Sequence, residues 1–505
     1  MSAGTITNLT TSAAHRYGNK TAITIPGGRS LGFSALDGAV ARFAGGLMRL
    51  GAARGERIVL HLPNGIDWVV AYHAIARIGG IVVPVNILLT PNEIAFIAEN
   101  SEAKFIIAGA DRHAALRAAI ANTASSKFVI VGDPTSDCPF EDLLLAHPIE
   151  PCNTSPEDIF TIAYTSGTTG KPKGAMLSHR AVFGAAATTA TIHVRHSGDR
   201  TLNALPLPHV YGNVVMNGAF IAGYELFLME RFDPKLALSL IQSERITLFE
   251  GVPTMYYQML SQDSLATIDV SALERCTVGG QTMPVAFIKE VEARFGCPLL
   301  ELWGMTELAG TATSHSPYWL NRHGSIGLPF PGVEVRIADL HDSGDSAPHG
   351  VAGELCVRGP SVMSGYWNNP AATSAAIDKD GWFATGDIAI QDADGYLRIV
   401  DRRKDMIITA GYNVYPAELE QVIAMLPAVA MVAVGSVPDV EKGELAKAFV
   451  VKRPGAHCTE EEIVQHCRKH LAAYKVPRQV VFVHNLPMTS TGKIMRRALG
   501  RDALK

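Results

Sequence analysis

Short apolar runs alternate with helical patterns along much of this 505-residue chain. The runs at 58–62 and 81–84 flank a helical pattern at 67–78, and Thr90-Pro91 predicts the start of another helix, because proline is well tolerated in the first turn. The alternation resumes between about 200 and 300. Strands that alternate with helices pair in parallel and are covered by helices, so the sequence predicts layered α/β structure.

Local signals near the N-terminus predict a hairpin followed by a helix. The apolar run 22–25 precedes the turn dipeptide Gly27-Gly28, and Ser34 and Asp37 have capping-box spacing, so a helix is expected from Ser34. The residues 28–32 also satisfy the G-x-S-x-G pattern of serine hydrolases. A nucleophile elbow needs a helix directly after its serine, whereas a return strand is expected here.

The amino-acid composition changes twice in the second half of the sequence. Gly and Pro become frequent between 315 and 400, where short strand-like runs predict a β-rich subdomain. A charged segment begins at Asp401, and the following 100 or so residues predict a small α+β unit with helices from Pro416 and from about Glu460. We therefore predict an α/β protein with an N-terminal domain, 1–400, and a C-terminal domain, 401–505. The first would contain two layered α/β subdomains and the β-rich subdomain.

Composition excludes several classes of function. The net charge of −4 argues against nucleic-acid binding by bulk electrostatics and against a polybasic membrane surface. No apolar run approaches the roughly 20 residues that a membrane-spanning helix needs. The seven cysteines form no C-x-x-C pair, which fits a reducing compartment, and no signal peptide is recognisable. These features predict a cytoplasmic protein with no membrane span.

The strongest local motif is YTSGTTGKPKG at 164–174, directly after a strand-like run. Its Gly, Ser and Thr residues allow close backbone approach and offer N–H and O–H donors to phosphate oxygens, while Lys171 and Lys173 add positive charge. It is not a Walker A loop, because Pro172 stands where the magnesium-binding Ser or Thr would be. A phosphate-binding loop is therefore predicted, with a hairpin tip without ligand as the alternative.

This motif resembles the phosphate loop of the ATP-dependent adenylate-forming superfamily, which includes acyl-CoA synthetases, luciferases and peptide-synthetase adenylation domains. Seven further segments resemble motifs of the same superfamily, in order, over about 330 residues. They are LPLPHVYG at 205–212, GGQ at 279–281, WGMTE at 303–307, GYWNNP at 365–370, WFATGD at 382–387, DRRKD with GYNVYPAE between 401 and 418, and PMTSTGK at 487–493.

The resemblance implies a role for each matching residue. The ATP phosphates would be held by Thr165, Ser166, Gly167, Thr168, Thr169, Gly170, Lys171 and Lys173. The adenine side would comprise Gly279, Gly280, Gln281, Trp303 and Gly304. Asp387 and Arg402 would meet the ribose, Thr306 the phosphates and Glu307 the Mg²⁺ ion. Relatives commonly carry Tyr at the position of Trp303, so a hydrogen bond from that hydroxyl is lost here.

Three further roles implied by the resemblance concern the reacting groups. Lys493 would lie between the substrate carboxylate and the α-phosphate, where a cation offsets the crowding of two anions. His209 would flank the acyl group as a gate, with ordinary packing as its alternative. The resemblance also implies a mobile C-terminal domain that rotates after adenylation, so that Gly411 and Tyr412 line the tunnel for coenzyme A, with Lys404 at the hinge.

The implied function is that of an AMP-forming acyl-CoA synthetase. A carboxylate is a poor acylating agent, and transfer of AMP from ATP gives it a good leaving group before coenzyme A accepts the acyl group. The expected partners are ATP, Mg²⁺, coenzyme A and a small carboxylic acid, whereas the oligomeric state, monomer or homodimer, is not predicted. Residues 205–212 resemble the substrate gate of the superfamily and are called the gate segment below. No cation is evident in this segment, which favours a medium-chain aliphatic or aryl/phenylpropenoid monocarboxylate, although Arg245 and Arg275 are near in sequence.

Alternatives remain at this stage. A small dicarboxylate such as malonate could be the acid, or a carrier protein could replace coenzyme A as the acceptor. Luciferases share the motifs, and an inactive nucleotide-binding homologue is disfavoured by the presence of Lys493, Glu307 and Asp387. His466 and His470 have a spacing that could bind zinc, but a solvated helix face is the simpler interpretation.

Overall fold

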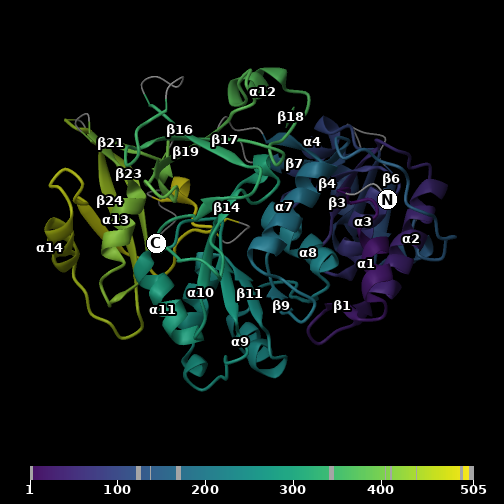
Figure 1. Ribbon diagram of the computed structural model, residues 1–505, viewed down its shortest axis with the longest axis horizontal. Coiled ribbons are helices and arrows are strands. Elements are labelled where there is room, and N and C mark those ends of the chain that lie inside the picture. The colour runs from purple at the N-terminus through teal and green to yellow at the C-terminus, as the bar shows by residue number, and fades with distance from the viewer. Residues whose placement is uncertain are drawn as a thin grey trace.

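The computed structural model describes residues 4–120, 127–136, 138–165, 172–340, 346–403, 405–409, 412–439, 441–489 and 493–499. Two large sheets, a smaller antiparallel sheet and a C-terminal α+β unit make up the architecture (Figure 1). The helices are α1 Leu9–Tyr17, α2 Phe33–Arg49, α3 Ile66–Arg77, α4 Pro91–Asn100, α5 Ala110–Ile120, α6 Phe140–Leu143, α7 His179–Ile192, α8 Val210–Ala222, α9 Pro234–Ser243, α10 Pro253–Leu260, α11 Val285–Phe295, α12 Pro370–Ala376, α13 Pro416–Ile423 and α14 Glu460–His470.

The two large sheets have parallel centres, as the alternation predicts. One has the order β15-β14-β13-β12-β11-β9-β10-β1-β2 and the other β18-β8-β7-β4-β3-β5-β6. Their strands are β1 Thr21–Thr24, β2 Ser30–Gly32, β3 Arg57–His61, β4 Ile81–Pro84, β5 Phe105–Gly109, β6 Lys127–Val131, β7 Ile159–Thr165, β8 Lys173–Ser178, β9 Arg200–Asn203, β10 Glu225–Leu228, β11 Leu248–Gly251, β12 Arg275–Val278, β13 Leu299–Trp303, β14 Thr313–Ser314, β15 Leu328–Pro329 and β18 Gly365–Tyr366.

Helices α3 and α8 fill the space between these sheets. Nearly all of their residues are buried, and His73 of α3 packs edge-on against Phe220 of α8, with 4.7 Å between ring centroids. Tyr72 of α3 contacts Phe160 of β7 on its other side at 5.0 Å. The apolar core is therefore shared by both sheets.

The region predicted to be β-rich forms a four-stranded antiparallel sheet, β16-β17-β19-β20. Its strands are β16 Glu334–Ala338, β17 Gly353–Arg358, β19 Phe383–Gln391 and β20 Leu397–Arg402. The next sheet is built from later residues alone, namely β21 Ile407–Thr409, β22 Tyr412–Val414, β23 Val429–Asp439, β24 Gly443–Lys452 and β25 Gln479–Phe482. The sheets thus change between 402 and 407, while the division into mobile domains at 400/401 stays a prediction.

Capping predictions fared differently at different helices. Helices begin at Pro91 and Glu460 as predicted, and Thr90 with Glu93, and Thr459 with Glu462, form capping boxes at their N-termini. The expected cap at Ser34 is wrong, because α2 begins at Phe33 without a side-chain cap. Asp37 instead accepts hydrogen bonds from the Thr10 and Thr11 hydroxyls and from the Arg77 guanidinium.

Two alternative sites from the sequence find no support. Ser30 lies in β2, which returns antiparallel to β1, so the strand–helix turn of a nucleophile elbow is absent there. The ring nitrogens of His466 and His470 bond to the carbonyl oxygens of Val422 and His466. In the described part of the chain, no helix has the length and apolarity needed to cross a membrane.

Candidate active site

Three segments meet on the phosphate side of the predicted site. Thr165 ends β7 and pairs with Lys173, which begins β8, and Tyr366 of β18 pairs with Ala175 of β8. The Nζ atom of Lys173 lies 5.1 Å from the centroid of the Tyr366 ring, and the Tyr366 hydroxyl donates a 3.0 Å hydrogen bond to Oε1 of Glu307. Residues 166–171, which include Ser166, Gly167, Thr168, Thr169, Gly170 and Lys171, are outside the described residues.

Tyr366 is a residue that the sequence interpretation missed. Burial, and then the charge of Glu307, raises the pKa of its hydroxyl, so the phenol stays protonated and donates to the carboxylate. The GYWNNP motif contained the signal, but no chemistry was assigned to its tyrosine. Carboxylate oxygens are ligands that Mg²⁺ prefers, so the buried Glu307, held by Tyr366, fits a role as metal ligand beside the phosphates.

Three of the predicted adenine and ribose residues, Trp303, Asp387 and Arg402, form a connected group. The indole N–H of Trp303 donates a 2.8 Å hydrogen bond to Oδ2 of Asp387. Oδ1 of Asp387 lies 3.1 Å from Nε of Arg402, which faces it across the β19–β20 pair. The hydroxyl of the tyrosine that relatives commonly carry is absent here. The indole N–H of Trp303 instead holds the ring in place through its hydrogen bond to Asp387.

The glycines of the predicted nucleotide-binding segments exclude a side chain for different structural reasons. A Cβ at Gly304 would lie 1.8 Å from the carbonyl oxygen of Gly310, so close backbone packing alone excludes a side chain there. A Cβ at Gly279 would lie 2.5 Å from the Leu302 side chain. Gly280 has a φ of +88°, and a Cβ there would lie 2.9 Å from Cε of Lys493. Only Gly280 thus bears directly on a predicted reacting residue.

Lys493 reaches this site from the C-terminal segment. Its N–H donates to the Thr489 hydroxyl at 3.0 Å, and its carbonyl accepts from the Thr489 N–H at 2.6 Å, which fixes a tight turn. Protein atoms surround its side chain although some solvent contact remains, and burial and then the charge of Arg402 lower its pKa to about 8, with Asp387 opposing. No ion pair or hydrogen bond joins its ammonium to any residue that the structure describes. An enclosed cation without a counter-ion fits an anionic substrate.

His209 stands beside this lysine. Its side chain caps α8 by accepting from the Tyr211 N–H at 3.3 Å. Burial, and then the charge of Lys493, lower the pKa of His209 to about 3, so the imidazole is neutral at ordinary pH. The cap explains its orientation, whereas its role as a gate stays a prediction.

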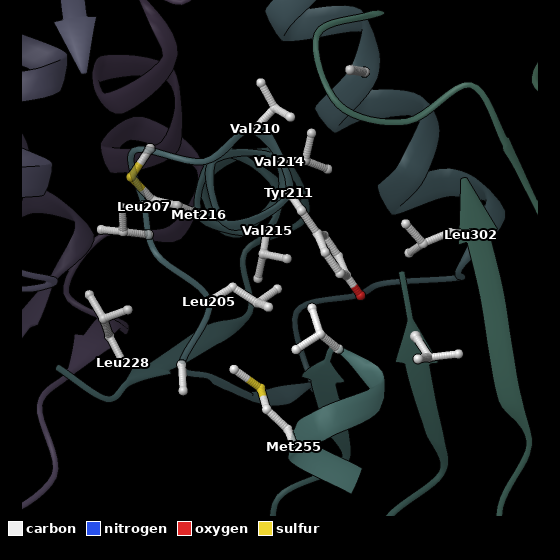
Figure 2. Packing of buried hydrophobic residues seen from close by; sticks show 14 of the residues in the cluster. Leu205, Leu207, Val210, Tyr211, Val214, Val215, Met216, Leu228, Met255 and Leu302 are labelled. Atoms are coloured by element: carbon white, nitrogen blue, oxygen red, sulfur yellow. The ribbon is translucent and has the colours of Figure 1, made fainter. Parts of the chain in front are cut away.

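The wall next to His209 is apolar and closed. Figure 2 shows the Tyr211 ring extending from α8 toward the side of Leu302, within a cluster that includes Val214 and Met255. The Tyr211 hydroxyl ends in a buried polar network, 2.6 Å from Oγ1 of Thr277 and 3.2 Å from Oε2 of Glu250. The phenol therefore turns its apolar ring, rather than its hydroxyl, to this wall.

A cavity of about 400 Å³ borders the gate segment at Pro206 and Pro208. It opens at the carboxyl ends of strands from both large sheets, where ligands of parallel sheets commonly bind. Its lining is mostly apolar and includes Leu62, Ile87, Pro206, Pro208, Met255 and Met488. The cavity thus borders the gate segment and shares Met255 with the Tyr211 wall.

A second unpredicted arrangement holds Arg496, in the described segment 493–499. Arg496 donates to both carboxylate oxygens of Glu420, at 3.2 and 2.6 Å, and to Oδ1 of Asp401 at 3.0 Å. Asp401 also accepts from the Ala417 N–H at the start of α13, at 2.9 Å. This network ties the segment of Lys493 to the start of the C-terminal unit.

Of the residues predicted for the coenzyme A loop, the structure describes Tyr412. Lys404 and Gly411 are outside the described residues. Tyr412 is 57% exposed and stacks on Tyr474, with 4.7 Å between ring centroids. The structure therefore brings Lys493, rather than Tyr412, to the nucleotide residues.

The chain matches known proteins along most of its length. Residues 10–367 match the AMP-binding enzyme family, and residues 418–493 match the C-terminal domain of AMP-binding enzymes. The chain is 33% identical to the long-chain-fatty-acid–CoA ligase of Bacillus subtilis (strain 168), over 98% of this chain and 94% of that protein. It is 35% identical to a feruloyl-CoA synthase of Amycolatopsis, over 94% of each chain.

A solved structure extends the match to three dimensions. The anthranilate CoA ligase AuaEII, in complex with anthranoyl-AMP, superimposes with a TM-score of 0.91 at 28% identity, over 99% of this chain and 97% of that one. The chain belongs to the AMP-binding enzyme family, in its branch of ATP-dependent, AMP-forming acyl-CoA ligases.

Proposed function

We propose that this ligase activates a monocarboxylic acid with an apolar acyl group, either medium-chain aliphatic or aryl. The supporting observation is that, among the described residues, the buried Arg195 and Arg275 are already paired, and Arg231, which lines the cavity, is solvent-exposed. Arg195 is fully buried in an ion pair with Glu250, and Arg275 pairs with Asp199. Arg245 is exposed. The relatives named for long-chain fatty acids, ferulate and anthranilate point the same way.

In the first step, a carboxylate oxygen of the acid attacks the α-phosphorus of ATP, and pyrophosphate leaves with the bonding electron pair. Two anions approach each other, so the transition state needs positive charge at the point of contact. The ammonium of Lys493 supplies it, while Thr165 and Lys173 bind the outer phosphates. Glu307 would hold Mg²⁺, which would neutralise phosphate charge when bound. Trp303 packs on adenine, and Asp387 accepts from the ribose hydroxyls.

In the second step, the sulfur of coenzyme A attacks the acyl carbonyl carbon, the acyl C–O bond breaks so that AMP leaves with the electron pair, and the thiol proton passes to solvent. The cavity beside Pro206 and Pro208 is the proposed approach for the thiol arm, because it is apolar and borders the segment of His209. The neutral imidazole of His209 can move aside without breaking an ion pair. Gly411 and Tyr412 are proposed to reach this side after rotation of the C-terminal unit.

Substrate class can be tested with two acids of equal length. We expect kcat/KM for octanoate to exceed that for octanedioate by about 100-fold or more, because a second carboxylate would be buried without a partner. A parallel assay with 4-hydroxycinnamate measures kcat/KM for an aryl acid. Comparable kcat/KM values for the mono- and dicarboxylate would contradict the proposal, and the malonate-type alternative would then be favoured.

The lowered pKa of Lys493 predicts a pH dependence. The ammonium is present below about pH 8 and lost above it. The kcat/KM for the acid, which reports the free enzyme, should therefore fall tenfold per pH unit above about pH 8. Bound anions favour the protonated form, so the decline in kcat should begin at a higher pH.

A charge-conserving variant provides the control for this profile. Arginine stays protonated at these pH values, so Lys493→Arg should have lower activity without the alkaline decline. Burial also raises the pKa of Glu301, on the strand of Trp303, to about 8. If the decline persists unchanged in Lys493→Arg, then Glu301 or another group, and not Lys493, is responsible.

A further inference from the structure

One short stretch of the N-terminal region, 280–290, receives several contacts from the C-terminal unit. Figure 1 shows α11, which begins in this stretch, beside the C-terminal elements. The Lys493 side chain lies against Gly280, and Arg453 forms a two-bond ion pair with Glu290 at 2.9 and 2.6 Å. The stretch therefore holds the C-terminal unit in the orientation that presents Lys493.

Gln281 makes the contact nearest to the lysine. Its Oε1 accepts a 2.8 Å hydrogen bond from the N–H of Ile494, and its Nε2 donates a 3.2 Å hydrogen bond to the carbonyl oxygen of the same residue. One side-chain amide thus satisfies both backbone groups of the residue directly after Lys493. Only a side chain with both a donor and an acceptor at this distance can do so.

These two hydrogen bonds between the Gln281 amide and the Ile494 backbone, called the clasp below, fix how far Lys493 extends into the site. The backbone of Ile494 is held by Gln281, while the Lys493 side chain passes over the Cα of the adjacent Gly280. A shift of the clasp would therefore move the ammonium, and transition-state stabilisation by a fixed charge is sensitive to displacements of about 1 Å.

We propose that Gln281 is a positioning residue for Lys493 in acyl-AMP formation, rather than a residue that binds adenine. This inference rests on the proposed role of Lys493 and adds the group that sets its place. It also implies that Gln281 acts in the first step only, because the clasp exists only while the C-terminal unit presents Lys493.

A second glutamine offers a matched control. Gln421 of α13 makes a similar pair of contacts, accepting from the Val285 N–H at 3.0 Å and donating to the Met283 carbonyl at 3.4 Å. It joins the same two parts of the molecule without touching the segment of Lys493. General weakening of the interface should therefore affect Gln281→Ala and Gln421→Ala alike, whereas positioning should affect only the first.

The test measures ATP–pyrophosphate exchange and, separately, thioester formation from supplied acyl-AMP and coenzyme A. For Gln281→Ala we expect kcat of exchange to fall about tenfold, as for the loss of two hydrogen bonds, with KM for ATP within twofold of wild type. Thioester formation should stay within twofold. Gln421→Ala should change either rate by threefold or less.

A double variant separates the possible outcomes. In the Lys493→Ala background, Gln281→Ala should cause no further loss if it acts through the lysine. A persistent tenfold loss there, or a tenfold rise in the ATP KM at unchanged kcat, would overturn the inference and favour adenine binding. If exchange is normal in Gln281→Ala but impaired in Lys493→Ala, the positioning role of Gln281 is refuted while the proposed role of Lys493 stands. Normal exchange in Lys493→Ala would refute the proposed role of the lysine.

Discussion

Replacing Lys493 with alanine should lower the rate of acyl-AMP formation by about 100- to 1000-fold, the usual cost of removing a fixed group that stabilises transition-state charge. The reason is geometric, because the ammonium lies beside Gly280 and has no ion-pair partner in the part of the chain that the structure describes. ATP–pyrophosphate exchange measures the effect, and the KM for ATP should change far less than kcat.

Folding is the control for Lys493→Ala. Since the ammonium makes no ion pair with a described residue, its removal should leave the thermal unfolding midpoint within about 2 °C of wild type. Thioester formation from supplied acyl-AMP should also persist. Exchange at the wild-type rate would show that the charge between carboxylate and phosphate comes from another group.

The second large effect is expected at Glu307. Glu307→Gln should lower kcat/KM for ATP by about 100-fold and move the Mg²⁺ requirement to higher concentrations, because a neutral amide is a weaker ligand for a hard cation. Chelation of Mg²⁺ with EDTA should abolish exchange in wild type and variant alike. The measurement is exchange rate against free Mg²⁺ concentration.

Tyr366→Phe is the matched control for Glu307. It removes the 3.0 Å hydrogen bond to Oε1 but leaves the carboxylate, so a loss of tenfold or less is expected, with a nearly unchanged Mg²⁺ midpoint. If Glu307→Gln responds to Mg²⁺ as wild type does, then Glu307 is not the metal ligand and its contact with Tyr366 is structural.

Local signals in the sequence predicted the fold well where the contacts were local. Thr90 and Thr459 cap helices through residues three positions away, and the parallel sheets follow from the strand–helix alternation. The cap expected at Ser34 is wrong because α2 begins one residue earlier, at Phe33, and Asp37 is engaged by Arg77, 40 residues away. A capping pattern does not report such a competing tertiary partner.

The same distinction holds at the site. The motifs predicted Trp303, Asp387 and Lys493, but not the contacts between them, which join residues far apart in sequence. The amide of Gln281 meets Ile494 across 213 residues, and the Tyr366 hydroxyl meets Glu307 across 59. Gly304 shows the reverse case, because close packing against Gly310 accounts for a glycine that the motif assigned to the nucleotide.

The most direct test of the whole account measures AMP release from ATP and Mg²⁺ across a panel of carboxylic acids, each with and without coenzyme A. We predict strong turnover that depends on coenzyme A, with one class of apolar monocarboxylic acids far ahead of the dicarboxylates. Pyrophosphate release that coenzyme A does not change, or turnover confined to dicarboxylates, would contradict it.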